Sequence, residues 1–291
     1  MSAHRAEAIQ DLIVGLEAYE LIPRASRTGH SAMSVSQHRV GFGGDFHSHR
    51  PFQSADDPRW IDIHSYLRTG KLWTKQYTKS LETKVVFALD CSRSMGMGDA
   101  SKWETGICTF LALKALCNRA GFATEMYVFS RQGVKKVPTE HTNHADPTAL
   151  DWLAAVRCRD KSSLAVLNDL RCEGETEIFV CSDFFWDGMY EQLDRFSLSN
   201  PFMGTFFRVL HAWDRSAPKG GYVDPESRGV GSLDTSDHAS VQRALDRFLS
   251  RWPSHCRARH IETVDLDSSD LLSTLTEWLM FRTLSARAGG V

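Results

Sequence analysis

Residues 85–96 read VVFALDCSRSMG, an apolar run that ends abruptly in small side chains carrying oxygen atoms. The run VVFAL contains no polar residue, which is typical of a strand that is buried on both faces of a parallel sheet. Directly after it, Asp90, Ser92 and Ser94 occupy every second position. A loop that curls around one point can bring three such side chains together. The end of this strand is therefore the first candidate for a functional site.

Downstream of residue 84 the chain alternates between apolar strands and amphipathic helices. The pattern predicts strands over 84–90, 122–130, 177–183, 204–214 and 258–266, and helices over 102–121, 147–157, 163–171, 190–196, 237–252 and 268–281. This alternation predicts an α/β fold with a doubly wound, mostly parallel sheet that helices cover on both faces. Ligands of such sheets bind beyond the carboxyl ends of the strands, and Asp90 and Asp183 both lie at such ends.

The first 82 residues have a different character. An apolar stripe at helical spacing predicts a first helix over residues 5–20, formed by Ile9, Leu12, Ile13, Leu16 and Tyr19. Residues 29–60 are rich in Gly and His and predict loops and short strands, and the alternation over 72–79 predicts a half-exposed strand. We therefore divide the chain into an N-terminal helix and β-rich segment over residues 1–82, packed on an α/β domain over residues 83–291.

Composition and charge narrow the range of partners. The 291 residues are 42% hydrophobic and 24% charged, with a formal net charge of -2 at pH 7. A chain with this net charge lacks the excess of basic residues that attracts nucleic acid or an anionic membrane, so we expect neither partner. No stretch reaches the roughly 18 apolar residues that a membrane span needs. The first twenty residues lack the pattern of a signal peptide, and the seven cysteines include no CxxC pair. We therefore expect free thiols and a cytoplasmic protein.

The oxygen-bearing residues after the first core strand favour a hard divalent cation. Carboxylates and hydroxyls are ligands suited to Mg²⁺ or Mn²⁺ rather than to softer metals. Further donors are Ser162 or Ser163, ahead of a predicted helix, and the Ser-Asp pair at residues 182–183. A purely structural alternative is that a serine of the first loop caps the next helix and that Asp90 accepts hydrogen bonds from backbone amides there. The second strand-end carboxylate, Asp183, favours the metal site.

The combination of these motifs resembles a known family. Asp90-x-Ser92-x-Ser94, a later hydroxyl-bearing loop and Ser-Asp after another strand resemble the metal-ion-dependent adhesion site of von Willebrand factor A-type domains. Residues 43–77, GGDFHSHRPFQSADDPRWIDIHSYLRTGKLWTKQY, resemble the stretch before that domain in a bacterial domain-of-unknown-function family, number fifty-eight. VLHAWD (209–214), YVDPES (222–227) and SLDTSDHAS (232–240) resemble the closing part of that family. The resemblance covers residues 30–280.

The resemblance implies a Rossmann-type, von Willebrand A-like domain with one Mg²⁺ or Mn²⁺ site. It implies that Ser92 and Ser94 bind the ion directly and that Asp90 and Asp183 act mainly through coordinated waters. The third-loop ligand, usually threonine in the family, falls on Ser162, with Ser163 as the alternative. A Glu or Asp carboxylate of a partner protein would fill the open coordination position.

Members of this family are typically encoded beside MoxR-type AAA+ ATPases and are thought to act with them. The resemblance therefore implies a divalent-cation-dependent protein–protein interaction module, an adaptor or assembly factor for such an ATPase or its client. The sequence departs from the family over residues 53–64, QSADDPRWIDIH, where a Gly usually precedes the Asp pair and a Trp follows Ile-Asp. The resemblance implies less about that patch. We assign Asp56, Asp57, Arg59 and Asp62 to ion pairs that fix the N-terminal segment to the α/β domain, with a second recognition surface as the alternative.

The sequence favours a protein without catalytic activity. Phosphatases of the haloacid dehalogenase type use a strand-end Asp as nucleophile and a second Asp two residues later as acid and base. Here the second position is Ser92, which cannot transfer that proton. The chain has no GxSxG, Walker or GxGxxG motif. The alternatives are a metal-dependent hydrolase of phosphate or ester substrates, and a scaffold with a decayed metal site.

Overall fold

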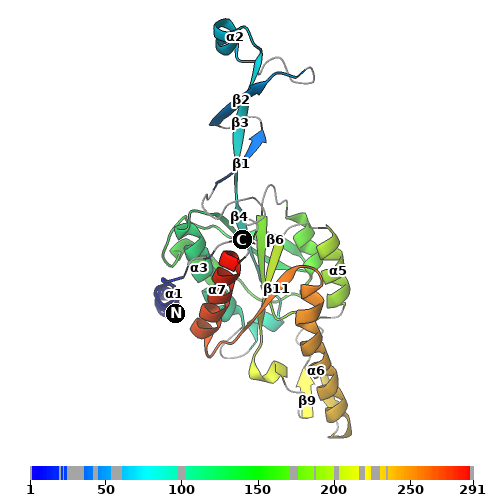
Figure 1. The fold of residues 1–291 in the computed structure, drawn as a ribbon. Helices are drawn as coiled ribbons and strands as arrows, with labels where there is room; N and C mark the ends of the chain where they lie inside the picture. Colours follow the sequence, from blue (N-terminus) through cyan, green and yellow to red (C-terminus); the bar gives the residue numbers. More distant parts are fainter. Residues whose placement is uncertain are drawn as a thin grey trace.

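The fold is described from a computed structural model of the chain. The structure describes residues 2–19, 21, 23–24, 36–41, 45–53, 61–97, 102–170, 176–186, 188–199, 203–215, 220–223, 230–233 and 235–288. Figure 1 shows an α/β domain and a three-stranded sheet that projects beyond it. No helix in these ranges combines the length and the apolar character that crossing a membrane requires.

The α/β domain is built on a six-stranded sheet with the order β11-β8-β7-β4-β5-β6. The strands are β4 (Lys84–Asp90), β5 (Ala123–Ser130), β6 (Gly133–Lys136), β7 (Thr176–Ser182), β8 (Met203–Val209) and β11 (Ile261–Leu266). All neighbours are parallel except β5 and β6, which form an antiparallel hairpin at one edge. This mostly parallel sheet, with helices on both faces, confirms the predicted α/β fold class and is consistent with a Rossmann-like, von Willebrand A-type fold.

Helices cover both faces of the sheet and enclose two hydrophobic cores. The helices of the first face are α1 (Ser2–Gly15), α3 (Lys102–Arg119), α4 (Pro147–Ala155) and α7 (Leu271–Ala288). Those of the second face are the short 3₁₀ helix η4 (Leu164–Asp169), α5 (Met189–Ser199) and α6 (Thr235–Arg257). In the first core, Phe110 of α3 packs edge-to-face on Phe87 of β4, with ring centroids 5.3 Å apart. Figure 1 shows α3 and α7 on one side of the sheet and α5 on the other.

The position of β4 explains why residues 85–89 are apolar without interruption. Val85, Phe87 and Leu89 belong to the first core, whereas Val86 and Ala88 belong to the second. Alternate side chains of a strand point to opposite faces, so a strand with helices on both sides buries every one of them. β7 is likewise buried at all seven positions.

The strand order places the switch point of the fold between β4 and β7. From β4 the chain crosses through α3 to β5 on one side, whereas β7 and β8 lie on the other side of β4. Connections that diverge in this way leave a crevice at the carboxyl ends of the two central strands. Asp90 is the last residue of β4 and Asp183 follows β7 directly. The topology therefore brings both aspartates to the same rim.

The N-terminal part has two components. α1 shares the first hydrophobic core with α3 through Ile9, Leu12 and Ile13. The projecting sheet has the order β1-β3-β2, from β1 (Ser36–Gly41), β2 (Asp45–Pro51) and β3 (Trp73–Glu82), and carries α2 (Ile63–Thr69) at its far end (Figure 1). Asp62 caps α2 by accepting a hydrogen bond from the backbone N–H of His64 (3.1 Å). Positions 56, 57 and 59 of the predicted ion-pair patch lie outside the described residues, and the division of the chain at residue 82 stays a prediction.

Several elements differ from their predicted bounds. The first helix ends at Gly15, the helix predicted over 163–171 is the shorter η4, and β6, at four residues, is too short to show a strand pattern. The strand predicted over 204–214 ends at Val209 because the Asp214 carboxylate accepts a hydrogen bond from the backbone N–H of His211 (2.8 Å) and turns the chain into η5 (Ala212–Arg215). A further hairpin, β9 (Gly220–Val223) and β10 (Val230–Leu233), lies beside α6 (Figure 1).

Gly106 allows α3 to lie close against the centre of the sheet. A Cβ atom at this position would lie 2.6 Å from Leu89 Cδ1 and 3.1 Å from Cys181 Sγ. We expect Gly106→Val to lower the free energy of unfolding by about 1–3 kcal/mol, because the added methyl groups overpack the contact between helix and strands. The urea midpoint of the purified variant measures this effect. A midpoint equal to that of the wild type would show that the helix has room to move.

Candidate metal centre

Asp90 lies at the centre of the candidate site. Its side chain is fully buried, and Oδ1 accepts a hydrogen bond from the backbone N–H of Ser92 (2.8 Å). Its Oδ2 accepts from the hydroxyls of Ser162 and Ser182, each at 2.6 Å. Asp90 thereby joins three segments: the loop after β4, the loop before η4 and the end of β7.

The two serines of the first loop lie beside each other. Ser92 Oγ and Ser94 Oγ are 3.2 Å apart, and both side chains are buried. Ser94 begins a single 3₁₀ turn (Ser94–Gly96), which curls the loop so that the second hydroxyl returns toward the first. Neither serine caps α3, which begins at Lys102. The loop therefore has the curled form that the spacing of its oxygen atoms predicted.

The structure distinguishes between the two serines of the loop before η4. Ser162 is buried and directs its hydroxyl to Asp90. The hydroxyl of Ser163 donates instead to Oε1 of Gln192 in α5, at 3.2 Å. Of the two alternatives, Ser162 therefore faces the candidate centre and Ser163 faces α5.

Asp183 lies at the same rim but is held by other partners. Its carboxylate is fully buried, and Oδ2 accepts a hydrogen bond from Lys102 Nζ at 2.8 Å. Lys102 Nζ also donates to Oδ1 of Asp214 at 3.0 Å, so one buried ammonium group bridges two carboxylates. All five candidate ligands lie in the described part of the chain, and no hydrogen bond joins Asp183 to the other four.

The backbone after β7 is turned sharply. Phe184 adopts a left-handed conformation with a φ of 55°, which is rare for a bulky residue and is held here by burial of its ring against Phe206 and Trp252. The turn lets the backbone N–H of Phe184 donate to Ser182 Oγ (3.1 Å) and that of Phe185 donate to Asp183 Oδ1 (3.2 Å). The end of β7 is thus anchored at both of its polar side chains.

Burial and charge shift the pKa values of this cluster. Burial, and then the negative charge of Asp183, raise the pKa of Asp90 from 3.8 to about 7, against the lowering effect of hydrogen bonds from Ser162, Ser182 and Ser92. Burial lowers the pKa of Lys102, but the charges of Asp183 and Asp214 outweigh it, so the net pKa shift is upward. Asp90 and Asp183 are therefore close enough to repel each other, and an additional positive charge beside Asp90 would favour its ionised form.

The donor set of this cluster fits a hard divalent cation that keeps part of its water shell. In the described ranges, no group of three or more His, Cys, Asp and Glu side chains could hold a metal ion by itself. A metal at this rim would therefore depend on serine hydroxyls together with the two carboxylates. Mg²⁺ accepts such a set, because it prefers oxygen ligands and retains several waters. Whether the five residues hold a cation stays a prediction.

The thiol of Cys91, which directly follows Asp90, does not fit a reactive role. The six cysteines in the part of the chain that the structure describes are free thiols. Burial, followed by the charge of Asp90, raises the pKa of Cys91 to about 12, and its Sγ donates to the carbonyl oxygen of Phe129 (3.2 Å). A thiol that stays protonated is neither a good nucleophile nor a good metal ligand.

Lys102 and Asp214 are the two residues of this cluster that the sequence interpretation missed. Lys102 stands in the first turn of α3, where a cation opposes the helix dipole and so needs a nearby negative charge. That unfavourable position is a signal from which a partner carboxylate could have been predicted. Asp214 lies 112 residues further along the chain, in η5, and its sequence signal is the VLHAWD stretch that ends at this residue and resembles the family.

The candidate centre lies within a region that is shared with a known family. The chain has no significant match among the curated proteins compared. A family model described as "Protein of unknown function DUF58" matches residues 48–248. The matched region contains all five candidate ligands and exceeds half of the chain. The chain therefore belongs to this family, DUF58.

Proposed function

We propose that this chain is a divalent-cation-dependent protein–protein interaction module. Ser92, Ser94 and Ser162 would hold Mg²⁺ or Mn²⁺ together with Asp90 and Asp183, the two carboxylates acting mainly through waters. The observation that supports this most is the hydrogen bonding of three separate segments to the one buried carboxylate of Asp90. The bound ion would have an open coordination position, which a carboxylate from another protein can occupy.

We infer that the partner offers a Glu or Asp side chain, and that the chain serves as an adaptor or assembly factor for a MoxR-type AAA+ ATPase or its client. Family membership agrees with this role but leaves the partner open. The hydrolase alternative needs an activated nucleophile. Ser182 is a poor candidate, because its hydroxyl donates to Asp90 and accepts from a backbone amide, which favours a structural role.

Cation binding is testable with the purified protein alone. Calorimetric titration with MgCl₂ is expected to show saturable binding, and Mg²⁺ is expected to raise the melting temperature, because a ligand that binds only the folded state stabilises it. If neither Mg²⁺ nor Mn²⁺ gives a heat of binding or a change in melting temperature, the scaffold alternative is supported instead.

Ser162 and Ser163 provide a matched pair of substitutions. Ser162→Ala is expected to weaken Mg²⁺ binding by about tenfold or more, the effect typical of losing a ligand or a group that orients one. Ser163→Ala removes a hydroxyl that points toward α5 and is expected to leave the Mg²⁺ affinity unchanged. Calorimetry on both variants measures the difference. Equal affinities in the two variants would remove the loop before η4 from the site.

Partner binding is tested by recovery from a native extract in Mg²⁺ and in EDTA. A partner recovered only in Mg²⁺, and not by Asp90→Ala, is expected. Equal recovery under both conditions would contradict the proposal. Turnover of a generic phosphoester by the wild type that disappears in Asp90→Ala would favour the hydrolase instead.

A further inference from the structure

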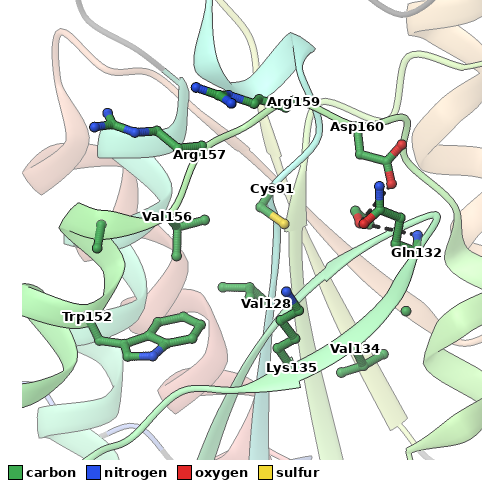
Figure 2. Close-up of a pocket in the computed structure, with 13 residues that line it drawn as sticks. Cys91, Val128, Gln132, Val134, Lys135, Trp152, Val156, Arg157, Arg159 and Asp160 are labelled. Carbon is green, nitrogen blue, oxygen red and sulfur yellow. Dashed lines mark hydrogen bonds between the residues drawn. The ribbon is translucent and has the colours of Figure 1, made fainter.

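A pocket of about 350 Å³ lies next to the candidate metal centre, at the β6 edge of the sheet. Its walls are the end of α4, the β5–β6 hairpin and the loop over residues 156–160. Figure 2 shows Trp152 and Val156 on one side, Gln132 and Asp160 on the other, and Cys91 and Val128 between them.

Four residues of the pocket lining are large and apolar. Val128 is buried, whereas Val134, Trp152 and Val156 are only half-buried and keep part of their surface open to the pocket. A hollow of this volume with an apolar lining falls at the lower end of the range for binding cavities. It suits one large apolar side chain rather than an extended molecule.

The rim of the pocket is cationic. Lys135, Arg157 and Arg159 line it and are exposed, and none of the three forms an ion pair within the described part of the chain. The acidic residue of the lining, Asp160, accepts a hydrogen bond from the hydroxyl of Ser130 at 3.1 Å. Three cationic side chains and the one carboxylate of Asp160 give the lining an excess of two positive charges, which favours an anionic partner although the net charge of the chain is -2.

The pocket and the candidate metal centre share the residues between them. Cys91 lines the pocket and directly follows Asp90. Asp160 lines the pocket, forms a β-bridge with Ser92 and accepts a hydrogen bond at its carbonyl oxygen from the backbone N–H of Arg93 (2.7 Å). A peptide that reaches a cation at Ser92 would therefore run across the cationic rim.

We propose that this pocket binds an acidic segment of a protein partner. One large apolar side chain of the segment enters the pocket, and carboxylates on either side of it contact Lys135, Arg157 and Arg159. The apolar lining distinguishes this partner from a nucleic acid, whose backbone would use the cations but not the hollow. The simultaneous contact with a cation at Ser92 rests on the function proposed above, whereas the preference of the pocket for this segment does not.

Unlabelled synthetic peptides titrated calorimetrically into the full chain test the proposal. Acetyl-EEFEE-amide is expected to bind saturably. Acetyl-EEAEE-amide is expected to bind at least about tenfold more weakly, because this peptide lacks the side chain that fills the pocket. Acetyl-KKFKK-amide is expected not to bind, since its charges repel those of the rim. Equal affinities for the Phe and Ala peptides, no binding of the Phe peptide, or tighter binding of single-stranded oligothymidine would overturn the proposal.

Two variants test the two parts of the pocket separately. Ala155→Trp changes an exposed residue at the end of α4 and fills the pocket, and the double variant Arg157→Glu with Arg159→Glu reverses the charge of the rim. Each variant is expected to bind the Phe peptide at least about tenfold more weakly than the wild type does. The matched control reverses two exposed arginines on the second face, Arg195 of α5 and Arg243 of α6, and is expected to bind as the wild type does. Wild-type affinity in Ala155→Trp would exclude the pocket.

The same titrations in Mg²⁺ and in EDTA separate this inference from the proposed function. Tighter binding in Mg²⁺ supports simultaneous contact with the cation. Equal affinity in both buffers contradicts that contact. If Ala155→Trp and the double arginine variant still bind the Phe peptide more weakly than the wild type does, the pocket proposal is upheld. If binding of the Phe peptide requires Mg²⁺ but is unchanged by the substitutions at Ala155, Arg157 and Arg159, the metal site is upheld and the pocket proposal is overturned.

Discussion

Asp90→Asn is expected to stabilise the cation-free protein at pH 8 and, at the same time, to abolish its stabilisation by Mg²⁺. Burial and Asp183 raise the pKa of Asp90 to about 7, so above that pH the folded chain holds a buried carboxylate near another one. Asparagine retains the shape of the side chain without the charge. The raised pKa corresponds to on the order of 4 kcal/mol, which is an upper estimate of the gain in the free energy of unfolding.

The sign of the pH dependence follows from the same shift. Because the pKa of Asp90 is higher in the folded than in the unfolded chain, the folded state binds this proton more tightly. The resulting stability is fully present below about pH 4 and is lost as the pH rises toward 7. The wild type in EDTA should therefore lose stability over this window through Asp90, and Asp90→Asn should show a flatter dependence.

A divalent cation is expected to oppose this trend, because it competes with the proton for the carboxylate. Stabilisation of the wild type by Mg²⁺ should be larger at pH 8 than at pH 5 and absent in Asp90→Asn at both. Urea unfolding at the two pH values, in EDTA and in Mg²⁺, measures all of these effects. A variant that is less stable than the wild type in EDTA at pH 8, or that keeps its response to Mg²⁺, would refute the role given to Asp90.

Lys102→Met is expected to lower the free energy of unfolding in EDTA by about 3–5 kcal/mol, the typical effect of removing one partner from a buried ion pair. The substitution leaves Asp183 and Asp214 without the ammonium group that joins them. If Asp183 belongs to the cation site, Mg²⁺ supplies part of the missing charge. The loss should therefore be smaller in Mg²⁺ than in EDTA.

Lys114 provides the matched control on the same helix. Its ammonium group is also buried and lies 3.0 Å from the buried carboxylate of Asp146, away from the rim of the sheet. Lys114→Met should therefore be destabilised to a similar degree, but Mg²⁺ should not restore its stability. Urea midpoints of the two variants with and without Mg²⁺ separate these outcomes. Equal restoration of both variants, or of neither, would place Asp183 outside the cation site.

The sequence allowed the fold class to be predicted because burial on both faces leaves a direct pattern. Residues 85–89 are apolar without interruption, since each side chain enters one of two cores. The end of α3 was equally predictable: Gly121, with a φ of 81°, lets the backbone N–H of Phe122 donate to Cys117 O (3.0 Å), as a glycine after a helix commonly does. Short elements such as β6 were not predictable, because four residues do not establish a period.

The local part of the candidate centre follows from the sequence alone, because Asp90, Ser92 and Ser94 lie within one tight loop whose spacing sets their approach. Its remaining contacts were decided by the tertiary structure. The hydroxyl of Ser162 donates to Asp90, whereas that of Ser163 donates to Gln192 in α5. The bridge from Lys102 to Asp183 and Asp214 joins positions 81 and 112 residues apart. Such pairings depend on which strands lie next to each other, and short-range residue patterns do not record that order.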